Sequence, residues 1–146
     1  MLSLLFSASK SPITFSKISP FCARIPTVSK EGAKVAIGAR RVDRLEELAK
    51  KISADGGEVF YQKLDVTQRS ECENFAKAVL DKWGSIDILV NNAGNAHGLD
   101  SIEEGSLDDW DAMIDINVKG LLYVSKAVLP TMVAKKAGHV INIGSI

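Results

Sequence analysis

From residue 31 onward, the spacing of apolar residues switches repeatedly between strand-like and helix-like. Apolar runs of strand length occur at residues 34–39 and 86–90, and residues 58–64 and 140–143 also indicate strands. Apolar residues at helical spacing occur at residues 42–54, at about 68–83, and from 106 to about 136. Strands that are apolar on both faces and alternate with helices of crossover length indicate a parallel sheet covered by helices. The pattern therefore predicts a doubly wound α/β fold.

Local signals predict where two of these helices begin and end. Gly56 and Gly57 follow the helix at 42–54 and are typical of a helix end. Ser106 is followed by Asp109, which resembles a capping box with Asp in place of the usual Glu. We therefore expect the Ser106 side chain to cap the helix that begins there.

Composition and charge exclude several classes of protein. The chain has 146 residues, 46% of them apolar and 25% charged, which is typical of a single globular domain. The formal net charge is zero, so bulk attraction to nucleic acid or to anionic membranes is not expected. No apolar run reaches the ~18 residues of a membrane-spanning helix. Cys22 and Cys72 have no CxxC or HxxxH pattern near them, so we expect neither a disulfide framework nor a metal site.

The balanced charge hides a compositional boundary near residue 30. Residues 1–30 carry four basic residues, no acidic residue, seven serines and three of the four prolines. Such a leader is typical of an organelle transit peptide, and the alternative is a divergent beginning that carries no address. We expect residues 1–30 to be disordered in either case. The compartment would be mitochondrial or plastid if this leader is a transit peptide, and cytoplasmic otherwise.

Five short motifs follow one another at the ends of the predicted strands and within the last helix. They are Gly38-Ala-Arg-Arg41, Leu64-Asp-Val-Thr67, Asn91-Asn-Ala-Gly94, Asn117 within IDINVKG, and Ile143-Gly-Ser145. Together they resemble the short-chain dehydrogenase/reductase (SDR) family, over about residues 30–146. Residues 108–145 look most like the NADP-dependent branch that oxidises serine and 3-hydroxy acids. The resemblance implies that residues 31–146 are part of a Rossmann-like NAD(P)-binding domain. It also implies an oxidoreductase that exchanges hydride with a hydroxyl or carbonyl group of a small substrate.

The resemblance implies NADP rather than NAD as the cofactor. An acidic residue after the second strand would hydrogen-bond the ribose 2′-hydroxyl of NAD. Arg40 and Arg41 stand there instead, and their charge and geometry suit the 2′-phosphate of NADP. The alternative is a pair of solvated arginines. Cations beside a helix N-terminus oppose the helix dipole by about 0.3–1 kcal/mol each, so local stability does not favour them.

Other matched residues are expected to line the cofactor. The family position of Asp65 accepts a hydrogen bond from the adenine amino group, with the Val66 backbone beside it. The alternative is a helix-capping aspartate, a role for which Thr67 is better placed. The turn that contains Asn91, Ala93 and Gly94 is expected to stabilise the central sheet and to line the ribose, because glycine lets the backbone approach a dinucleotide closely.

Two matched positions carry the catalytic prediction. In the family, the position of Asn117 kinks its helix and holds a water of the proton relay, and the position of Ser145 hydrogen-bonds the substrate oxygen. The family also needs a YxxxK pair, in which the lysine lowers the pKa of the proton-donating tyrosine. Tyr61 is followed by Asp65 and Tyr123 by Ala127, so neither tyrosine forms this pair. We therefore expect these 146 residues to be inactive on their own.

The family's phosphate-binding turn, TGxxxGxG, is absent from residues 1–60. We therefore expect the first strand, the middle one of the sheet, to be missing, together with everything after the fifth strand. Its loss would expose two apolar edges and forgo roughly 8–15 kcal/mol of burial, so the chain would fold poorly or aggregate and would not hold a dinucleotide. Two alternatives to a partial SDR remain. One is a non-catalytic module that forms dimers through helices at about 106–136, and the other is an aberrant product without function.

Overall fold

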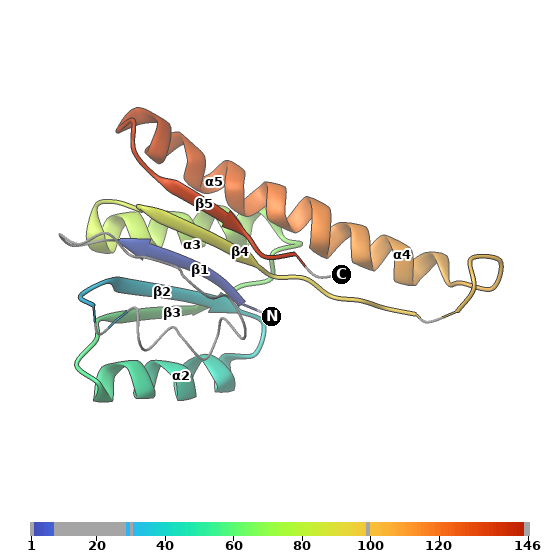
Figure 1. The fold of residues 1–146 in the computed structure, drawn as a ribbon, viewed down its shortest axis with the longest axis horizontal. Helices are drawn as coiled ribbons and strands as arrows, with labels where there is room; N and C mark the ends of the chain where they lie inside the picture. Colours follow the sequence, from blue (N-terminus) through green and yellow to red (C-terminus); the bar gives the residue numbers. More distant parts are fainter. Residues whose placement is uncertain (1, 8–28, 30, 99, 145–146) are drawn as a thin grey trace.

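A sheet with helices on both faces makes up the fold (Figure 1). The computed structural model describes residues 2–7, 29, 31–98 and 100–144. Within them, the strands lie in the order β3-β2-β1-β4-β5. Their bounds are β1 Leu2–Ser7, β2 Lys34–Ala39, β3 Val59–Lys63, β4 Ile88–Asn92 and β5 His139–Asn142. The strand pairs β2–β3 and β4–β5 are parallel.

The helices form two groups. Two of them connect successive strands: α2 at Val42–Ala54 and α3 at Arg69–Trp83. The others follow one another without a break before β5: α4 at Leu107–Ile114, the π-helix η2 at Asp115–Gly120, and α5 at Leu121–Ala134. Together these three form one long helix whose α4 end extends beyond the sheet (Figure 1).

The predicted doubly wound, Rossmann-like α/β fold is confirmed. The bounds of β2 and α2 coincide with the predicted ranges. The other strands and α3 differ from prediction by only one or two residues at most of their ends. The single helix predicted from residue 106 to about 136 contains a π-helical turn that apolar spacing did not indicate.

The prediction that the sheet lacks its middle strand is wrong. Residues Leu2–Ser7 form β1, which pairs antiparallel with both β2 and β4. The physical reason is that an extended apolar segment can offer its backbone groups in either direction, and all three leader prolines lie beyond residue 7. Residues 8–28 and 30 lie outside the described residues, so the predictions of disorder and of a transit peptide stay predictions there.

The core lies in two layers because successive residues of a strand face opposite sides of the sheet. On one face, Val35, Ile37 and Val90 pack with residues of α2, among them Leu45 and Ile52. On the other face, Ala36 and Leu89 pack with residues of α3 and α5, among them Phe75, Val79, Val124 and Val128. The sheet is therefore covered by α2 on one side and by α3 and α5 on the other.

Two expected helix caps differ in the structure. Ser106 does precede α4, but its side chain makes no capping hydrogen bond. Thr67 is not the cap of α3, because the residue before that helix is Gln68. The hydroxyl of Thr67 instead donates to Asp65 Oδ1 at 2.8 Å, which turns this side chain away from the helix end.

The described part of the chain contains no helix that is long and apolar enough to cross a membrane. In the same residues, no group of three or more His, Cys, Asp or Glu side chains could hold a metal ion.

Replacing Phe75 should destabilise the fold strongly. Phe75 is 1% exposed, and its ring stacks on that of Phe60 with a centroid distance of 6.1 Å. We expect Phe75→Ala to lower the free energy of unfolding by about 3–5 kcal/mol, measured by urea titration, because it leaves a cavity. Ile102, 81% exposed, gives the control, since Ile102→Ala should change stability by less than about 0.5 kcal/mol. Equal losses in the two variants would contradict this core.

Candidate functional site

A cleft lies at the edge of the sheet where the parallel strands end. It is lined by Gly38, Arg40, Leu64, Asp65, Val66, Ala93, Gly94 and Ile116. These residues come from the end of β2, the loops after β3 and β4, and the π-helix η2. In open α/β sheets, ligands bind outside the carboxyl ends of the strands, near the point where the strand order reverses. The cleft occupies such a position.

The cleft brings together most of the predicted cofactor residues. Arg40, Asp65, Val66, Ala93 and Gly94 line it, although up to 54 positions separate them in the sequence. Three lining residues were not predicted to bind the cofactor, although Gly38 and Leu64 begin two of the motifs and Ile116 lies within IDINVKG. Gly38 could have been found from its place within an apolar strand, where glycine often marks a close approach of another group. Neither Leu64 nor Ile116 carries such a signal.

Two glycines let the walls of the cleft approach one another. A Cβ atom on Gly38 would lie 2.7 Å from Leu64 Cδ2 and 3.2 Å from Phe75 Cζ. One on Gly120, in η2, would lie 2.6 Å from Val66 Cγ2. Both distances to the nearest atom are too short for a side chain, so these glycines fix how closely β2 and η2 pack against the loop after β3.

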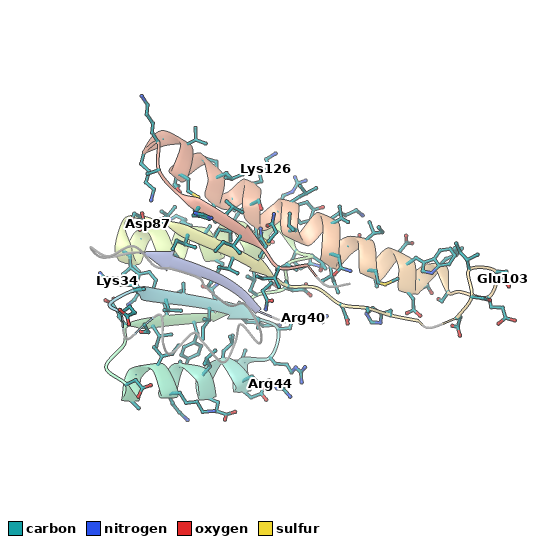
Figure 2. All side chains as sticks on the ribbon, viewed as in Figure 1. Lys34, Arg40, Arg44, Asp87, Glu103 and Lys126 are labelled. Atoms are coloured by element: carbon teal, nitrogen blue, oxygen red, sulfur yellow. The ribbon has the colours of Figure 1, made fainter. Side chains whose placement is uncertain are left out.

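Arg40 lines the cleft, and two further arginines follow it at the start of α2; we call these three residues the arginine rim. Arg40 follows β2, Arg41 is the residue that precedes α2, and Arg44 lies in the first turn of that helix (Figure 2). Arg40 and Arg41 are exposed. Neither guanidinium forms an ion pair with any of residues 31–98 or 100–144. The rim therefore presents cations that a bound anion could pair with.

Only one carboxylate oxygen of Asp65, Oδ1, accepts hydrogen bonds within the loop after β3. Oδ1 accepts hydrogen bonds from the Thr67 backbone N–H at 3.0 Å and from the Thr67 hydroxyl at 2.8 Å. The Asp65 backbone N–H donates to Glu71 Oε2 at 2.7 Å. Oδ2 has no hydrogen-bond partner among the described residues, so this oxygen can accept from a ligand. Asp65 thus combines the turn-forming role with the chemistry that the resemblance implies.

Asn91 lies beneath the cleft and does not line it. Its side chain is buried, and its Nδ2 donates to Ser125 Oγ at 3.0 Å and to Asn142 Oδ1 at 2.9 Å. These contacts tie β4 to α5 and to β5. Of the two roles expected for the Asn91 turn, stabilising the central sheet belongs to Asn91, and lining the cleft belongs to Ala93 and Gly94.

Asn117 connects the π-helix to the loop after β4. Its Oδ1 accepts from the Asn95 backbone N–H at 2.8 Å, and its Nδ2 donates to the Asn95 carbonyl at 2.8 Å. The wider turn of η2 gives this residue a place outside the regular α-helical ladder, and π-helical turns are frequent at functional sites. Asn117 therefore fixes the backbone one residue beyond the NNAG turn.

Charged and titratable groups flank Asn117. Lys119 Nζ lies 2.7 Å from Asp115 Oδ1, and this hydrogen bond raises the pKa of Lys119. In the loop after β4, His97 Nε2 lies 2.7 Å from Asn95 Nδ2, and His97 Nδ1 lies 3.9 Å from Asp109 Oδ1. His97 is thus a loop residue that helps to order the segment before α4.

The thiol of Cys72 contacts the cleft residue Val66, but its reactivity is suppressed. Burial raises its pKa to about 11, and its thiol donates to the Val66 carbonyl at 3.5 Å. A thiol that remains protonated near neutral pH is a poor nucleophile. Ser145, the predicted substrate-binding serine, lies outside the described residues. Among the described residues that line the cleft, no catalytic acid or base is assigned.

Comparison with known proteins identifies the family. Residues 23–146 match the short chain dehydrogenase family. The chain is 44% identical over 116 residues to the NADP-dependent 3-hydroxy acid dehydrogenase YdfG of Shigella flexneri, a match that covers 80% of this chain and 46% of that protein. The chain belongs to the short-chain dehydrogenase/reductase family, and the resemblance to its 3-hydroxy acid and serine dehydrogenase branch is confirmed.

Solved structures agree with this assignment. The crystal structure of serine dehydrogenase from Escherichia coli superposes with a TM-score of 0.75 and 41% identity, covering 85% of this chain and 56% of that one. A metagenomic short-chain oxidoreductase in complex with NADP superposes with a TM-score of 0.81 and 34% identity, covering 86% and 57%. The chain spans about half the length of the curated relatives that it matches.

The hydrogen bond from the Asn95 backbone N–H to Asn117 predicts how fast the Asn95 amide exchanges its hydrogen with solvent. We expect Asn117→Leu to speed exchange of the Asn95 amide about ten-fold, because that amide loses its acceptor. Asn117→Asp keeps the acceptor oxygen and loses only the donor, so it should slow exchange relative to the leucine variant. NMR or mass spectrometry would measure the rates. The same Asn95 exchange rate in all three proteins would contradict the role of Asn117.

Proposed function

We propose that the chain is the NADP-binding half of an oxidoreductase that acts on a hydroxyl or carbonyl group of a small substrate. One observation carries this proposal: five of the residues expected to bind the cofactor line one cleft at the carboxyl edge of the sheet. The family membership supports the reaction class. NADP appears in the name of the Shigella flexneri relative and in the metagenomic complex.

The cleft fits the adenosine 2′-phosphate end of the cofactor. Arg40 and Arg41 would hold the 2′-phosphate, because guanidinium groups bind phosphate oxygens in a bidentate manner. Leu64, Val66 and Ile116 provide an apolar lining for the adenine ring, and Asp65 Oδ2 can accept from its amino group. This arrangement uses both the guanidinium groups and the carboxylate oxygen that have no partner among the described residues.

The pyrophosphate end does not fit in the same way. In the family, a glycine-rich turn after the first strand and a helix N-terminus bind this group. Here β1 runs in the opposite direction, so its carboxyl end, Ser7, pairs with Lys34 at the far edge of the sheet. The described carboxyl end of β1 therefore lies at the end of β2 opposite the cleft. The chain by itself therefore offers a site for half of the dinucleotide.

The substrate side of the reaction needs groups beyond the cleft. When bound, NADP would accept or supply the hydride. Asn117 would keep the loop at Asn95 in place, and Ser145 would hydrogen-bond the substrate oxygen. The YxxxK pair, which would exchange the proton, is not among these 146 residues. Expressed alone, they should therefore turn over neither alcohols nor ketones.

Calorimetry with nucleotide fragments tests the cofactor proposal. Adenosine 2′,5′-bisphosphate should bind at least about ten-fold more tightly than 5′-AMP, because hydrogen bonds to a charged group contribute about 1.5–3 kcal/mol. Arg40→Ala should remove most of this preference and leave the affinity for 5′-AMP almost unchanged.

Lys77→Ala provides the matched control. Lys77 is exposed on α3 and pairs with Asp81, away from the cleft lining, so both nucleotide affinities should stay as in the unmodified chain. Equal binding of the two nucleotides, or a preference that survives in Arg40→Ala, would contradict the assignment of the rim. NADP binding much tighter than that of the bisphosphate would show that the pyrophosphate is held without the family's turn.

A second candidate function, self-association, rests on one exposed helix face. Large exposed apolar residues follow one another along the long helix at spacings of four or seven: Ile114, Val118, Leu122, Leu129 and Val133. Leu122, Leu129 and Val133 line a shallow groove whose wall is almost entirely apolar. A contiguous exposed apolar patch marks an interaction site. We propose that a second copy covers this face.

Sedimentation velocity tests this association. Val133 is 71% exposed, so Val133→Glu should leave the fold intact. It should convert a dimer to monomer, because a charge would be buried in the interface. Lys50→Glu, on the exposed side of α2, is the control and should leave the dimer in place. A dimer that persists in Val133→Glu, or a chain that is monomeric throughout, would contradict the proposal. Association without nucleotide binding would favour an interaction module over a cofactor-binding half.

A further inference from the structure

β1 is a reversed strand in the middle of an otherwise parallel sheet. It pairs along its whole length with β2, from Leu2 opposite Ala39 to Ser7 opposite Lys34. On its other side it pairs with β4, from Leu2 opposite Asn92 to Phe6 opposite Ile88. Its main contacts are with these two strands. Backbone pairing on both edges therefore holds β1 in the sheet.

The connection between β1 and β2 does not impose this direction. An antiparallel neighbour needs a turn of only two residues, whereas a parallel neighbour needs a crossover of about a dozen or more. Residues 8–33 join the two strands. This segment is long enough for a crossover, although the strands that it joins are antiparallel. The position and direction of β1 thus follow from its pairing and not from a tight tether.

The walls on either side of β1 are positioned by other elements. Val35, Ala36 and Ile37 in β2, and Leu89 and Val90 in β4, are 0% exposed. On their outer edges, β2 pairs with β3 and β4 pairs with β5. Helices α2, α3 and α5 pack against the faces. The facing edges of β2 and β4 each carry a row of backbone N–H and C=O groups, and the gap between these edges is one strand wide. Buried backbone groups of this kind require hydrogen-bond partners.

We propose that the space between β2 and β4 is a strand-acceptor site, and that residues 2–7 occupy it as an exchangeable strand. A second copy of the chain can supply the same segment, which then binds in the same antiparallel register. Recognition is of the β-augmentation type, in which main-chain hydrogen bonds provide affinity for an extended segment. Exchange of an identical element between copies is a low-cost route to association.

Occupancy of the strand-acceptor site affects the separation of the two walls of the cleft. Leu2 pairs with Ala39 and with Asn92, and the next residues, Arg40 and Ala93, line the cleft on its two sides. The bound strand therefore holds the two walls of the cleft at a fixed separation. This coupling rests on the proposed cofactor cleft, whereas the strand-acceptor site itself does not.

Paired cysteines in the full chain test the place and direction of the strand. Ser7 and Lys34 are register partners, and such pairs lie about 4.5–5.5 Å apart at Cα, within the range that a disulfide bridges. In a chain carrying Cys22→Ser, the pair Ser7→Cys with Lys34→Cys should oxidise readily. The pair Ser7→Cys with Ala39→Cys should not, because residue 39 lies at the other end of β2. The reverse result, or oxidation of neither pair, would overturn the proposal.

Mixing two singly substituted chains tests exchange without weakening the strand. Chains with Ser7→Cys alone and with Lys34→Cys alone are combined at high concentration, brought briefly to mild denaturant, returned to buffer and oxidised. We expect at least about ten-fold more covalent heterodimer than from Ser7→Cys mixed with Ala39→Cys. Equal yields from the two mixtures would overturn exchange between copies. Neither assay uses nucleotide, so failure here is distinct from failure of the proposed cofactor site.

Discussion

Main-chain hydrogen bonding by β1 is the interaction on which the rest of the fold depends. Without it, the sheet would divide into β3–β2 and β4–β5, and an isolated two-stranded ribbon is marginally stable at best. The inner edges of β2 and β4 carry residues that are wholly buried. Each buried backbone group left unpaired there would cost about 1–3 kcal/mol. A segment of six residues thus converts two weak ribbons into one sheet that supports helices on both faces.

Continuity of the sheet also decides what the cleft can bind. The arginine rim follows β2 and the Ala93–Gly94 wall follows β4, so their separation is set by the one strand between them. Asn91 strengthens the β4 side through Ser125 and Asn142. Because β1 is reversed, its carboxyl end at Ser7 lies beside Lys34, at the end of β2 opposite the cleft.

Much of the fold and the cleft could be predicted because the relevant signals are local. The apolar run KVAIGA and the spacing of Leu45, Leu48 and Ile52 determine β2 and α2 directly. The ends of parallel strands meet at one edge, so Arg40, Asp65 and Gly94 had to lie near one another. β1 could not be predicted, because its partners are distant in sequence and either direction satisfies its backbone. Apolar spacing indicated neither the π-helical turn at Asn117 nor the buried contacts of Asn91. The family resemblance did imply a helix kink at Asn117 and a sheet-stabilising role for the Asn91 turn.

Native-state hydrogen exchange of the backbone amides in β2 and β4 tests most directly whether β1 makes one unit of the sheet. Amides that open only when the whole domain unfolds share a single free energy of opening. If β1 joins the two halves, the slowest amides within Val35–Ala39 and within Leu89–Asn92 should report the same value, equal to the global free energy of unfolding. Opening of the β4–β5 half at a clearly lower free energy than the β2–β3 half would contradict this account.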